Sequence, residues 1–230
     1  MTDIASQDIE LIDSLVRHYR EKEQARATRL AKNLFDLFSE ESLAPYVHSV
    51  RRRAKDPEHL RDKLTRKLRK ARKDGESFEI TSDNLFVKIN DLAGVRLLHL
   101  HTSQFPKIDE IVRGLLRSEA YEITEGPTAR IWDDEYKEIF TKYGIQTINN
   151  SRLYTSVHYV VSTGGDQART AEIQIRTLAE ELWGEVDHTI NYPQPSEIQS
   201  CKEQIKVLAR LTSSCTRLVD SIFLTGGTKR

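Results

Sequence analysis

Hydrophobic residues recur at helical spacing at both ends of the chain. In the first forty residues they come at steps of three and four, which predicts helices, and no Pro or Gly occurs before Pro45. Near the other end the same spacing joins Ile198, Cys201, Ile205, Leu208, Leu211, Cys215, Leu218 and Ile222. The sequence therefore predicts a long helix at each end. The apolar stripe of the last helix is expected to pack on the domain, on the first helix or on another subunit.

The segment between these helices alternates strand-like and helix-like patterns. "VRLLHLH" (95–101) predicts a strand, residues 105–117 predict a helix, and "YEIT" (121–124) predicts a further apolar stretch. A short helix is expected over 133–144. Gly144 is expected to stop it, because a residue without a Cβ suits the C-terminal cap. The strand–helix–strand order indicates a βαβ-type unit.

Two later segments predict a β-hairpin. "SVHYVVS" and "AEIQIRT" have strand character and flank the Gly164-Gly165 turn, and a helix is expected from Leu178 to about His188. Successive side chains of a strand point to opposite faces. "AEIQIRT" therefore carries Ile173 and Ile175 on one face. Its other face carries an acid, an amide and a base, namely Glu172, Gln174 and Arg176.

Composition narrows the class of protein. At 230 residues the leading expectation is one α/β domain with helical extensions, and 30% charged against 38% hydrophobic residues is ordinary for a soluble protein. A formal net charge of zero indicates no polyanion partner for the molecule as a whole. The chain has no apolar run of membrane-spanning length and a polar N-terminus, which predicts neither a membrane segment nor a signal peptide. Cys201 and Cys215 are too far apart for a disulfide along one helix, so we expect a reduced, cytoplasmic protein.

A basic segment covers residues 51–73, with twelve Lys or Arg against three Asp or Glu. A solvated helix face is the ordinary interpretation of such a run. However, three of its arginines precede the helix that Asp56 and Pro57 are expected to start. In that helix Lys63 and Lys67 share a face, where like charges repel. An anion between them would relieve the repulsion, and a polyphosphate is the natural candidate.

Acidic residues provide a possible metal site. Asp91 stands at the start of the strand in "NDLAGVRLL", where Gly94 allows a close backbone approach and Arg96 alternates with apolar residues. Asp91 and Glu172 on neighbouring strands would suit Mg²⁺, which prefers a few carboxylates plus phosphate and water oxygens. A turn residue is the plainer interpretation of Asp91 alone.

The segment "YTSVHYVV" adds a polar row of Tyr154, Ser156 and His158, spaced by two and expected on one strand face. A lone strand His is more often structural, but this row lies beside the charged row of the next strand. Tyr can stack on a base, and Ser and His can bond phosphates. Trp183 is expected in the core, whereas His188 either caps its helix or supports the site.

In this order, the motifs resemble the synthetase domain of the RelA/SpoT family, whose members make the alarmones pppGpp and ppGpp. The resemblance covers residues 50–192, and the size is similar to that of small alarmone synthetases. The matching residues are Arg53, Lys55 and Lys63 in "RRAKDPEHLRDK", Asp91, Gly94 and Arg96 in "DLAGVR", Tyr154, Ser156 and His158 in "YTSVH", Glu172, Gln174, Arg176 and Thr177 in "EIQIRT", and Trp183, His188 and Tyr192 in "WGEVDHTINY".

The resemblance implies an α/β (α+β) fold, a nucleotidyltransferase-like mixed β-sheet flanked by helices with long N- and C-terminal helices. Residues 1–48 would form an N-terminal helical extension, 49–193 the synthetase core and 194–230 a C-terminal helix. The implied reaction transfers the β,γ-pyrophosphate of ATP to the 3′-hydroxyl of GDP or GTP and leaves AMP.

The resemblance also implies roles for single residues. Asp91 and Glu172 would bind Mg²⁺, and Glu172 would accept the 3′-hydroxyl proton. Arg53 and Arg96 would sandwich the adenine by their flat guanidinium groups. The ATP phosphates would be held by Lys55 and Lys63, with Lys67 on the same helix face. The acceptor nucleotide would be bound by Tyr154, Ser156, His158, Gln174 and Arg176, with Arg152 and His188 in supporting positions.

The chain departs from the family pattern chiefly on the acceptor side. Family members usually carry a basic, Gly-containing loop that ends in Gly-Tyr, whereas "TINNSRLY" has Leu153 before the Tyr and Arg152 as its only base. His59 replaces the usual Ser of the first motif, and Pro193 follows Tyr192 where Lys is usual. The donor ATP is therefore better supported than the acceptor.

Three hypotheses remain open on the sequence. The first is an ATP-dependent pyrophosphokinase acting on guanosine nucleotides. The second is the toxic branch of small synthetases, which would use adenosine nucleotides or the 3′-CCA end of tRNA, with an antitoxin protein as a further partner. The third is a catalytically silent nucleotide sensor. In each, the terminal helices are expected to mediate a homo-oligomer.

Overall fold

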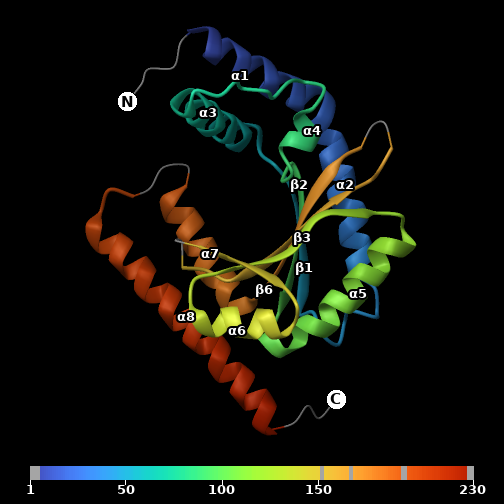
Figure 1. Cartoon of the computed structure of the whole chain (residues 1–230), viewed down its shortest axis with the longest axis vertical. Coiled ribbons are helices and arrows are strands. Elements are labelled where there is room, and N and C mark those ends of the chain that lie inside the picture. Colours follow the sequence, from blue (N-terminus) through green and yellow to red (C-terminus); the bar gives the residue numbers. More distant parts are fainter. Residues whose placement is uncertain (1–5, 151–152, 166–167, 193–195, 227–230) are drawn as a thin grey trace.

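The computed structural model describes residues 6–150, 153–165, 168–192 and 196–226, and these ranges contain a six-stranded mixed sheet (Figure 1). The strand order is β1-β2-β6-β5-β3-β4. The β2–β6 and β3–β4 pairs are parallel and the other pairs are antiparallel. The strands are β1 (Ser49–Ala54), β2 (Ala93–His99), β3 (Glu122–Ile131), β4 (Gln146–Asn149), β5 (Ser156–Ser162) and β6 (Thr170–Thr177).

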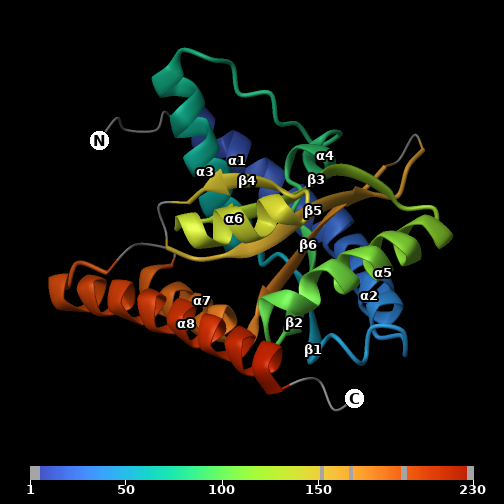
Figure 2. The same cartoon turned by 60° about the horizontal axis from the view of Figure 1, so that its bottom comes forward.

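Helices surround this sheet, and the long N- and C-terminal helices expected from the sequence are confirmed (Figure 2). The α-helices are α1 (Ser6–His18), α2 (Gln24–Phe38), α3 (Pro57–Asp74), α4 (Leu85–Lys88), α5 (Phe105–Ser118), α6 (Asp134–Lys142), α7 (Leu178–Asn191) and α8 (Gln199–Gly226). A π-helical turn (Tyr19–Glu23) joins α1 to α2, and a 3-10 turn (Thr102–Gln104) precedes α5. The mixed α/β class is therefore confirmed.

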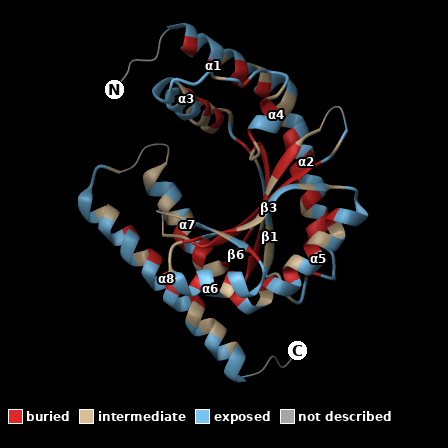
Figure 3. Ribbon diagram, in the orientation of Figure 1, coloured by how far each residue is buried: buried red, intermediate tan, exposed pale blue. Residues whose placement is uncertain are grey.

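The two faces of the sheet differ in polarity because the strands alternate. Ile173 and Ile175 of β6 and Val95 and Leu97 of β2 are buried in the main hydrophobic core. Helices α2 and α5 contact this side of the sheet, and Figure 3 shows buried residues along them and the strands. The opposite face carries the polar residues of the same strands, which leaves it free to form a site.

The N-terminal helices belong to the main core rather than to a separate unit. Leu34 and Phe38 of α2 are buried in the same cluster as the sheet. The hydroxyl of Tyr19, in the π-helical turn, donates a 2.7 Å hydrogen bond to the carbonyl oxygen of Lys55, just after β1. This segment therefore helps to fix the end of β1, where several candidate residues lie.

Helix α3 begins where the sequence predicts and ends at a glycine. The Asp56 side chain accepts hydrogen bonds from the backbone amides of Glu58 and His59, and Pro57 opens the helix. Gly75 follows at φ 72°, the left-handed conformation that glycine adopts without a Cβ clash. The leucines Leu60, Leu64 and Leu68 are buried, which turns the basic face of the helix away from the core.

Helix α8 packs on α7 around a small apolar cluster formed by Trp183, Ile205 and Ala209. The burial expected for Trp183 is therefore confirmed. Cys201 and Leu208 of the stripe also pack against this cluster, whereas Leu211 is 61% exposed and Leu218 is 63% exposed. Both cysteines, Cys201 and Cys215, are free.

Several elements differ from the sequence expectation. Strand β1 was not predicted, because three consecutive arginines on an exposed edge strand give no apolar alternation. Strand β3 runs well beyond the predicted stretch 121–124. The rest of the strand was not predicted, because its pairing is irregular around Gly126 and its side chains do not alternate regularly there. Strand β4 is short and mostly exposed, so it has no clear pattern either. No helix in the described part of the chain combines the length and apolar character needed to cross a membrane.

Candidate active site

The polar face of the sheet gathers charged side chains from four strands. Gly94 of β2 lies opposite Glu172 of β6, and Gln174 of β6 lies opposite His158 of β5. Cross-strand partners point to the same face of a sheet. On β1, Arg53 lies opposite Gly94 and therefore faces the same side. The acid–amide face of "AEIQIRT" thus lies in the middle of a polar surface.

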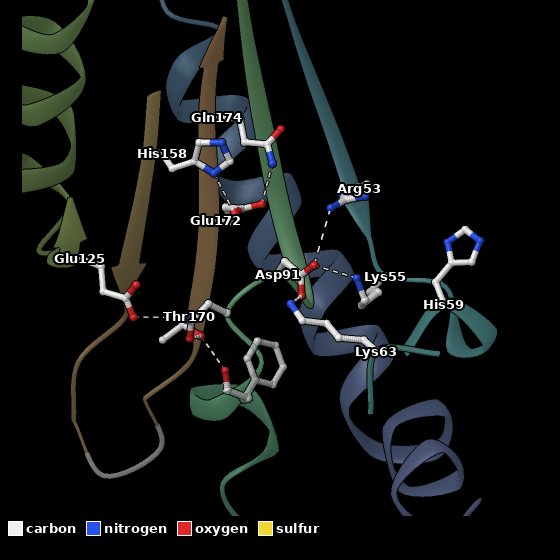
Figure 4. A network of polar contacts seen from close by, with 12 residues as sticks. Arg53, Lys55, His59, Lys63, Asp91, Glu125, His158, Thr170, Glu172 and Gln174 are labelled. Carbon is white, nitrogen blue, oxygen red and sulfur yellow. Dashed lines mark hydrogen bonds and ion pairs between the residues drawn. The ribbon is translucent and has the colours of Figure 1, made fainter. Parts of the chain in front are cut away.

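Asp91 lies just before β2 and is held by basic side chains (Figure 4). Its two carboxylate oxygens each accept a 2.7 Å hydrogen bond, one from Nζ of Lys55 and one from Nζ of Lys63. Nη2 of Arg53 lies 3.9 Å from Oδ2. Burial opposes ionisation of Asp91, but the two ammonium groups outweigh it and hold the pKa of the carboxyl well below its usual range.

Glu172 is held by its neighbours on the sheet (Figure 4). Its Oε1 lies 3.0 Å from Nδ1 of His158, and its Oε2 accepts a 2.7 Å hydrogen bond from Nε2 of Gln174. The other ring nitrogen of His158 lies 2.6 Å from Oγ of Ser156. Burial raises the pKa of Glu172, but His158 and Gln174 lower it more, to about 2. The carboxylate is therefore ionised at neutral pH.

Both acids line one cavity of about 260 Å³ on the polar face, which we call the sheet cavity. Within the described ranges, no group of three or more His, Cys, Asp and Glu side chains is arranged to hold a metal ion. Two ionised carboxylates facing one cavity are nevertheless the donor set that suits Mg²⁺ beside a phosphate ligand. Asp91 and Glu172 therefore fit such an ion, although the lysines at Asp91 compete with it.

A larger cavity of about 740 Å³ lies between α3, α7 and α8, and we call it the helix cavity. It shares Lys63 and Asp91 with the sheet cavity, so the two meet there. Its basic wall contains Arg53, Lys55, Lys63 and Arg66 from β1 and α3, and Lys202 and Lys206 from α8. Such a space has the volume and charge for a nucleotide with several phosphates.

A third cavity of about 120 Å³, the arginine cavity, lies between β1 and β2. Arg53 and Arg96 both line it, as does Gly94 between them. Two acids of α7 hold Arg96: its Nη1 lies 2.7 Å from Oε1 of Glu185 and 3.2 Å from Oε1 of Glu181. Glu181 also pairs with Arg51 and with Arg176. Helix α7 thereby fixes the guanidinium of Arg96 at this cavity.

The structure corrects one expectation about the polar row of Tyr154, Ser156 and His158. Tyr154 was expected on the same strand face as Ser156, but β5 begins only at Ser156. The ring of Tyr154 instead stacks on that of Trp183, at 5.6 Å between centroids and 19° between planes. The reason is the left-handed conformation of Leu153, φ 60°, which interrupts the extended chain. Tyr154 lines none of the three cavities just described.

Arg176 also lies apart from these cavities. Its buried guanidinium pairs with Glu181 and lies against Gly184 of α7. Without a ligand Lys63 pairs with Asp91, and the polyphosphate expected between Lys63 and Lys67 stays a prediction. Lys67 lines the sheet cavity and not the helix cavity, and Arg152 lies outside the described residues.

His188 does not end its helix, because α7 continues to Asn191. Its ring stacks on Tyr192, with 4.6 Å between centroids, and His59 approaches Tyr192 edge-on at 4.4 Å. All three residues line the helix cavity. This aromatic cluster joins α3 to α7, and it places His59 at the wall of the cavity.

Sequence reasoning missed several charged residues that the fold brings to the site. Lys88, Glu125 and Arg130 line the sheet cavity, and Glu181 and Glu185 hold Arg96. Arg130 was missed because the second half of β3 was not predicted. For Glu181 and Glu185 the sequence offered one signal: their i,i+4 spacing places both on the same face of the helix that follows β6.

Comparisons with known proteins agree with this fold. The structure of a GTP pyrophosphokinase family protein from Streptococcus pneumoniae superposes with a TM-score of 0.58 and 19% identity, covering 95% of this chain and 94% of that one. Small alarmone synthetase 1 of Bacillus subtilis, bound to its product pppGpp, superposes with a TM-score of 0.54 and 21% identity. This match covers 92% of this chain and 95% of that one. Small alarmone synthetase 2 of the same organism superposes with a TM-score of 0.57 and 20% identity, covering 89% of this chain and 97% of that one.

A search of curated protein sequences gives no match to the chain. The family profile described as "Region found in RelA / SpoT proteins", however, matches residues 52–197, which is more than half of the chain. The matched range begins within β1 and includes the other five strands of the sheet as well as Asp91, Glu172 and their basic partners. The chain therefore belongs to the RelA/SpoT family.

Proposed function

We propose that the protein is an ATP-dependent pyrophosphokinase that transfers the β,γ-pyrophosphate of ATP to the 3′-hydroxyl of GDP or GTP. The observation that carries the proposal is that two ionised carboxylates and two lysines lie at adjoining cavities. Asp91 and Lys63 line both cavities, Glu172 lines the sheet cavity and Lys55 lines the helix cavity. Solved structures of the same fold are named as GTP pyrophosphokinase and small alarmone synthetases, one with pppGpp bound.

The donor is assigned to the arginine and helix cavities. Arg53 and Arg96 would hold the adenine between their guanidinium planes, and Lys55 and Lys63 would bind the phosphates. In the free protein these lysines neutralise Asp91. A triphosphate that takes over the lysines frees the carboxylate, so the donor and a divalent cation fit the site best together.

Asp91 and Glu172 would hold Mg²⁺, which when bound neutralises phosphate charge and orients the donor. The acceptor 3′-oxygen then forms a bond to the β-phosphorus, and the bond from that phosphorus to the α–β bridging oxygen breaks, releasing AMP. The hydroxyl proton passes to the hydrogen-bonded pair of Glu172 and His158. A carboxylate with a pKa of about 2 is a weak base alone, so His158 is assigned a share of this role.

One assay tests the proposal directly. The purified protein is incubated with γ-labelled ATP, Mg²⁺ and, separately, GDP, GTP, ADP or deacylated tRNA, and the labelled product is identified. We expect label on GDP and GTP. Label on tRNA or ADP alone would instead place the protein in the toxic branch, and binding of nucleotides without any transfer would favour a silent sensor.

One substitution tests the role of the Glu172 carboxylate. Glu172→Gln keeps the shape of the side chain and its contact with His158 but removes the negative charge. Loss of a group that binds the cation and shares the proton should lower the transfer rate at least about a hundredfold, with unchanged circular dichroism. Full activity of Glu172→Gln would refute the role given to this residue.

A further inference from the structure

One carboxylate joins arginines from three strands of the sheet. Glu181 of α7 is buried, with 5% of its surface exposed, and it pairs with Arg51 of β1, Arg96 of β2 and Arg176 of β6. Its Oε1 lies 3.3 Å from Nη1 of Arg51 and 3.2 Å from Nη1 of Arg96. Its Oε2 pairs with Arg176. We call Glu181 and its arginines the Glu181 cluster. They come from separate elements, so the fold and not a local charge run brings them together.

Two members of the Glu181 cluster face each other on neighbouring strands. Arg51 lies directly opposite Arg96 in the β1–β2 register, so both side chains are on the same face of the sheet. Like charges at directly opposite positions repel and destabilise the pairing. The Oε1 atom of Glu181 contacts both guanidinium groups, and its negative charge offsets this repulsion. The positions of Arg51 and Arg96 therefore depend on Glu181.

The third arginine ties the carboxylate to the interior of the protein. The guanidinium of Arg176 is buried, and burial and the charge of Arg96 lower its pKa. The charges of Glu180, Glu181 and Glu185 act in the opposite direction. Because the pair of Arg176 with Glu181 is shielded from solvent, the Glu181 carboxylate has little freedom to move.

No other acid among the described residues bridges the two opposed arginines. Glu185 pairs with Arg96 at 2.7 Å but not with Arg51, and its side chain is half exposed. Glu172 lines the arginine cavity, but its two oxygens are engaged by its own neighbours on the sheet. Within the described ranges, Glu181 and Glu185 therefore provide all the ion pairs of Arg51 and Arg96.

The arginine cavity lies beside the Glu181 cluster. Arg51 and Arg96 line it together with Arg53, whereas Glu181 is not among its described lining residues. Glu181 thus acts on this cavity through the arginines. A flat ring stacks on a guanidinium only when the two planes face each other at close range. The cavity therefore binds a base well only if its arginines keep a fixed arrangement.

We propose that Glu181 is a positioning residue for the base of the donor nucleotide. By holding Arg51 and Arg96 together against their repulsion, it keeps the arginine cavity ready to receive a flat base before the donor binds. Such preorganisation lowers the cost of ordering these side chains when the donor binds. This inference rests on the proposed function, which places the adenine between Arg53 and Arg96.

The experiment compares two ligands that share a chain of phosphates but differ in the base. Calorimetry measures the binding of ATP and of inorganic tripolyphosphate, each with Mg²⁺, to the full chain. Transfer from γ-labelled ATP to GDP is followed in parallel. The variants are Glu181→Gln, Arg51→Gln and the double variant. Glu138→Gln on the exposed side of α6 is the matched control, because Glu138 lines none of the cavities above and has no ion pair among the described residues.

We expect the unchanged protein to bind ATP more tightly than tripolyphosphate. Glu181→Gln should weaken ATP binding about tenfold, which is within the range of couplings in one salt-bridge network, and should leave tripolyphosphate binding unchanged. Arg51→Gln alone should have a smaller effect. In the double variant part of the lost affinity should return, because the repulsion at Arg96 is then removed. The KM for ATP should follow the affinity with little change in kcat, and Glu138→Gln should behave as the unchanged protein does.

A second variant covers loss of folding. Glu181→Gln leaves the charge of Arg176 buried without its partner, which is destabilising, so thermal unfolding first shows whether this variant is folded. If it is not, Glu181→Asp takes its place. The shorter side chain keeps a negative charge near Arg176 but cannot reach both Arg51 and Arg96, so we expect the same pattern of affinities.

Equal loss of ATP and tripolyphosphate affinity in the Glu181 variant would overturn the inference, as would a double variant that recovers no ATP affinity. An unchanged protein that binds the two ligands equally would overturn it as well. The expected affinities without any transfer of label would refute the proposed function and still support a base site positioned by Glu181. Normal transfer together with unweakened ATP binding by the Glu181 variant would overturn this inference alone.

Discussion

The carboxylates at the centre of the site are held by side chains of the protein itself before any substrate binds. Asp91 accepts from Lys55 and Lys63, and Glu172 contacts His158. Such pairs settle the ionisation of each acid and hold it facing the cavity. In the proposed loaded site, phosphate would take the place of the Asp91 carboxylate at the lysines, and a metal ion would take the place of the ammonium groups at Asp91.

The pairing makes Asp91 structurally important as well. Asp91→Asn would leave the buried ammonium of Lys55 without its counter-charge. Removing one partner of a buried pair is strongly destabilising, so we expect a loss of about 3 kcal/mol in the free energy of unfolding, measured by urea denaturation. The exposed Asp83→Asn is the control. An unchanged stability of Asp91→Asn would show that the pair contributes nothing.

Glu180 of α7 provides a pH-dependent prediction. Burial raises the pKa of Glu180 from 4.5 to about 7, although its carboxylate accepts a hydrogen bond from the Thr155 amide. The folded state then binds a proton that the unfolded state releases, so stability falls as pH rises from about 4.5 to about 7, by about 3 kcal/mol in all. Glu180→Gln should remove this fall. Denaturation midpoints of both proteins across this range test the expectation, and parallel curves would contradict it.

At the scale of elements, α7 organises the arginines of the polar face. Glu181 and Glu185, one turn apart, hold Arg96, and Gly184 between them leaves room for Arg176. A Cβ at position 184 would lie 2.6 Å from Nη1 of Arg176. Helix α7 therefore positions the arginine side chains of the sheet through its acids and its glycine, and does not only pack by apolar contacts.

Gly184→Ala should destabilise the protein by about 1–2 kcal/mol, because the buried guanidinium of Arg176 must move from Glu181. Gly114→Ala is the matched control: Gly114 lies in the exposed middle of α5 with nothing within 4 Å of the added Cβ. That change should stabilise by up to about 1 kcal/mol through helix propensity. Thermal unfolding of both variants measures the difference, and the same sign for both would contradict the account.

The same elements show how far the sequence could predict this structure. The N-cap of Asp56 and the alternation of "AEIQIRT" are local signals, and both were predicted correctly. The pairing of β1 with β2 and the return of α7 over Arg96 depend on contacts between distant segments. Burial of Arg176 and stacking of Tyr154 were missed for that reason, since single-residue periodicity cannot show which helix covers a strand.

At the scale of the whole molecule, the uncovered stripe of α8 remains to be explained. Leu211, Leu218 and Ile222 are each more than half exposed, and no described element packs on them. Exposed apolar side chains in a row on one long helix are typical of an interface. We propose that a second copy of the chain covers them, which is one of the three packing partners expected from the sequence.

Light scattering tests this proposal. The unchanged protein should have the mass of an oligomer, and Leu211→Glu should shift it toward the monomer because a buried charge without a partner weakens the interface. Val87→Glu, at a half-exposed apolar position on α4, should leave the mass unchanged. A monomer at high concentration before any substitution would rule the interface out.

The central claim is transfer of pyrophosphate between two nucleotides at Asp91 and Glu172, and the nucleotide products test it most directly. With ATP, Mg²⁺ and GDP, chromatography should show one AMP for each GDP converted to a 3′-pyrophosphorylated product, and neither with Glu172→Gln. Formation of ADP in place of AMP would indicate transfer of a single phosphate. That result, or conversion that is independent of Glu172, would contradict the account.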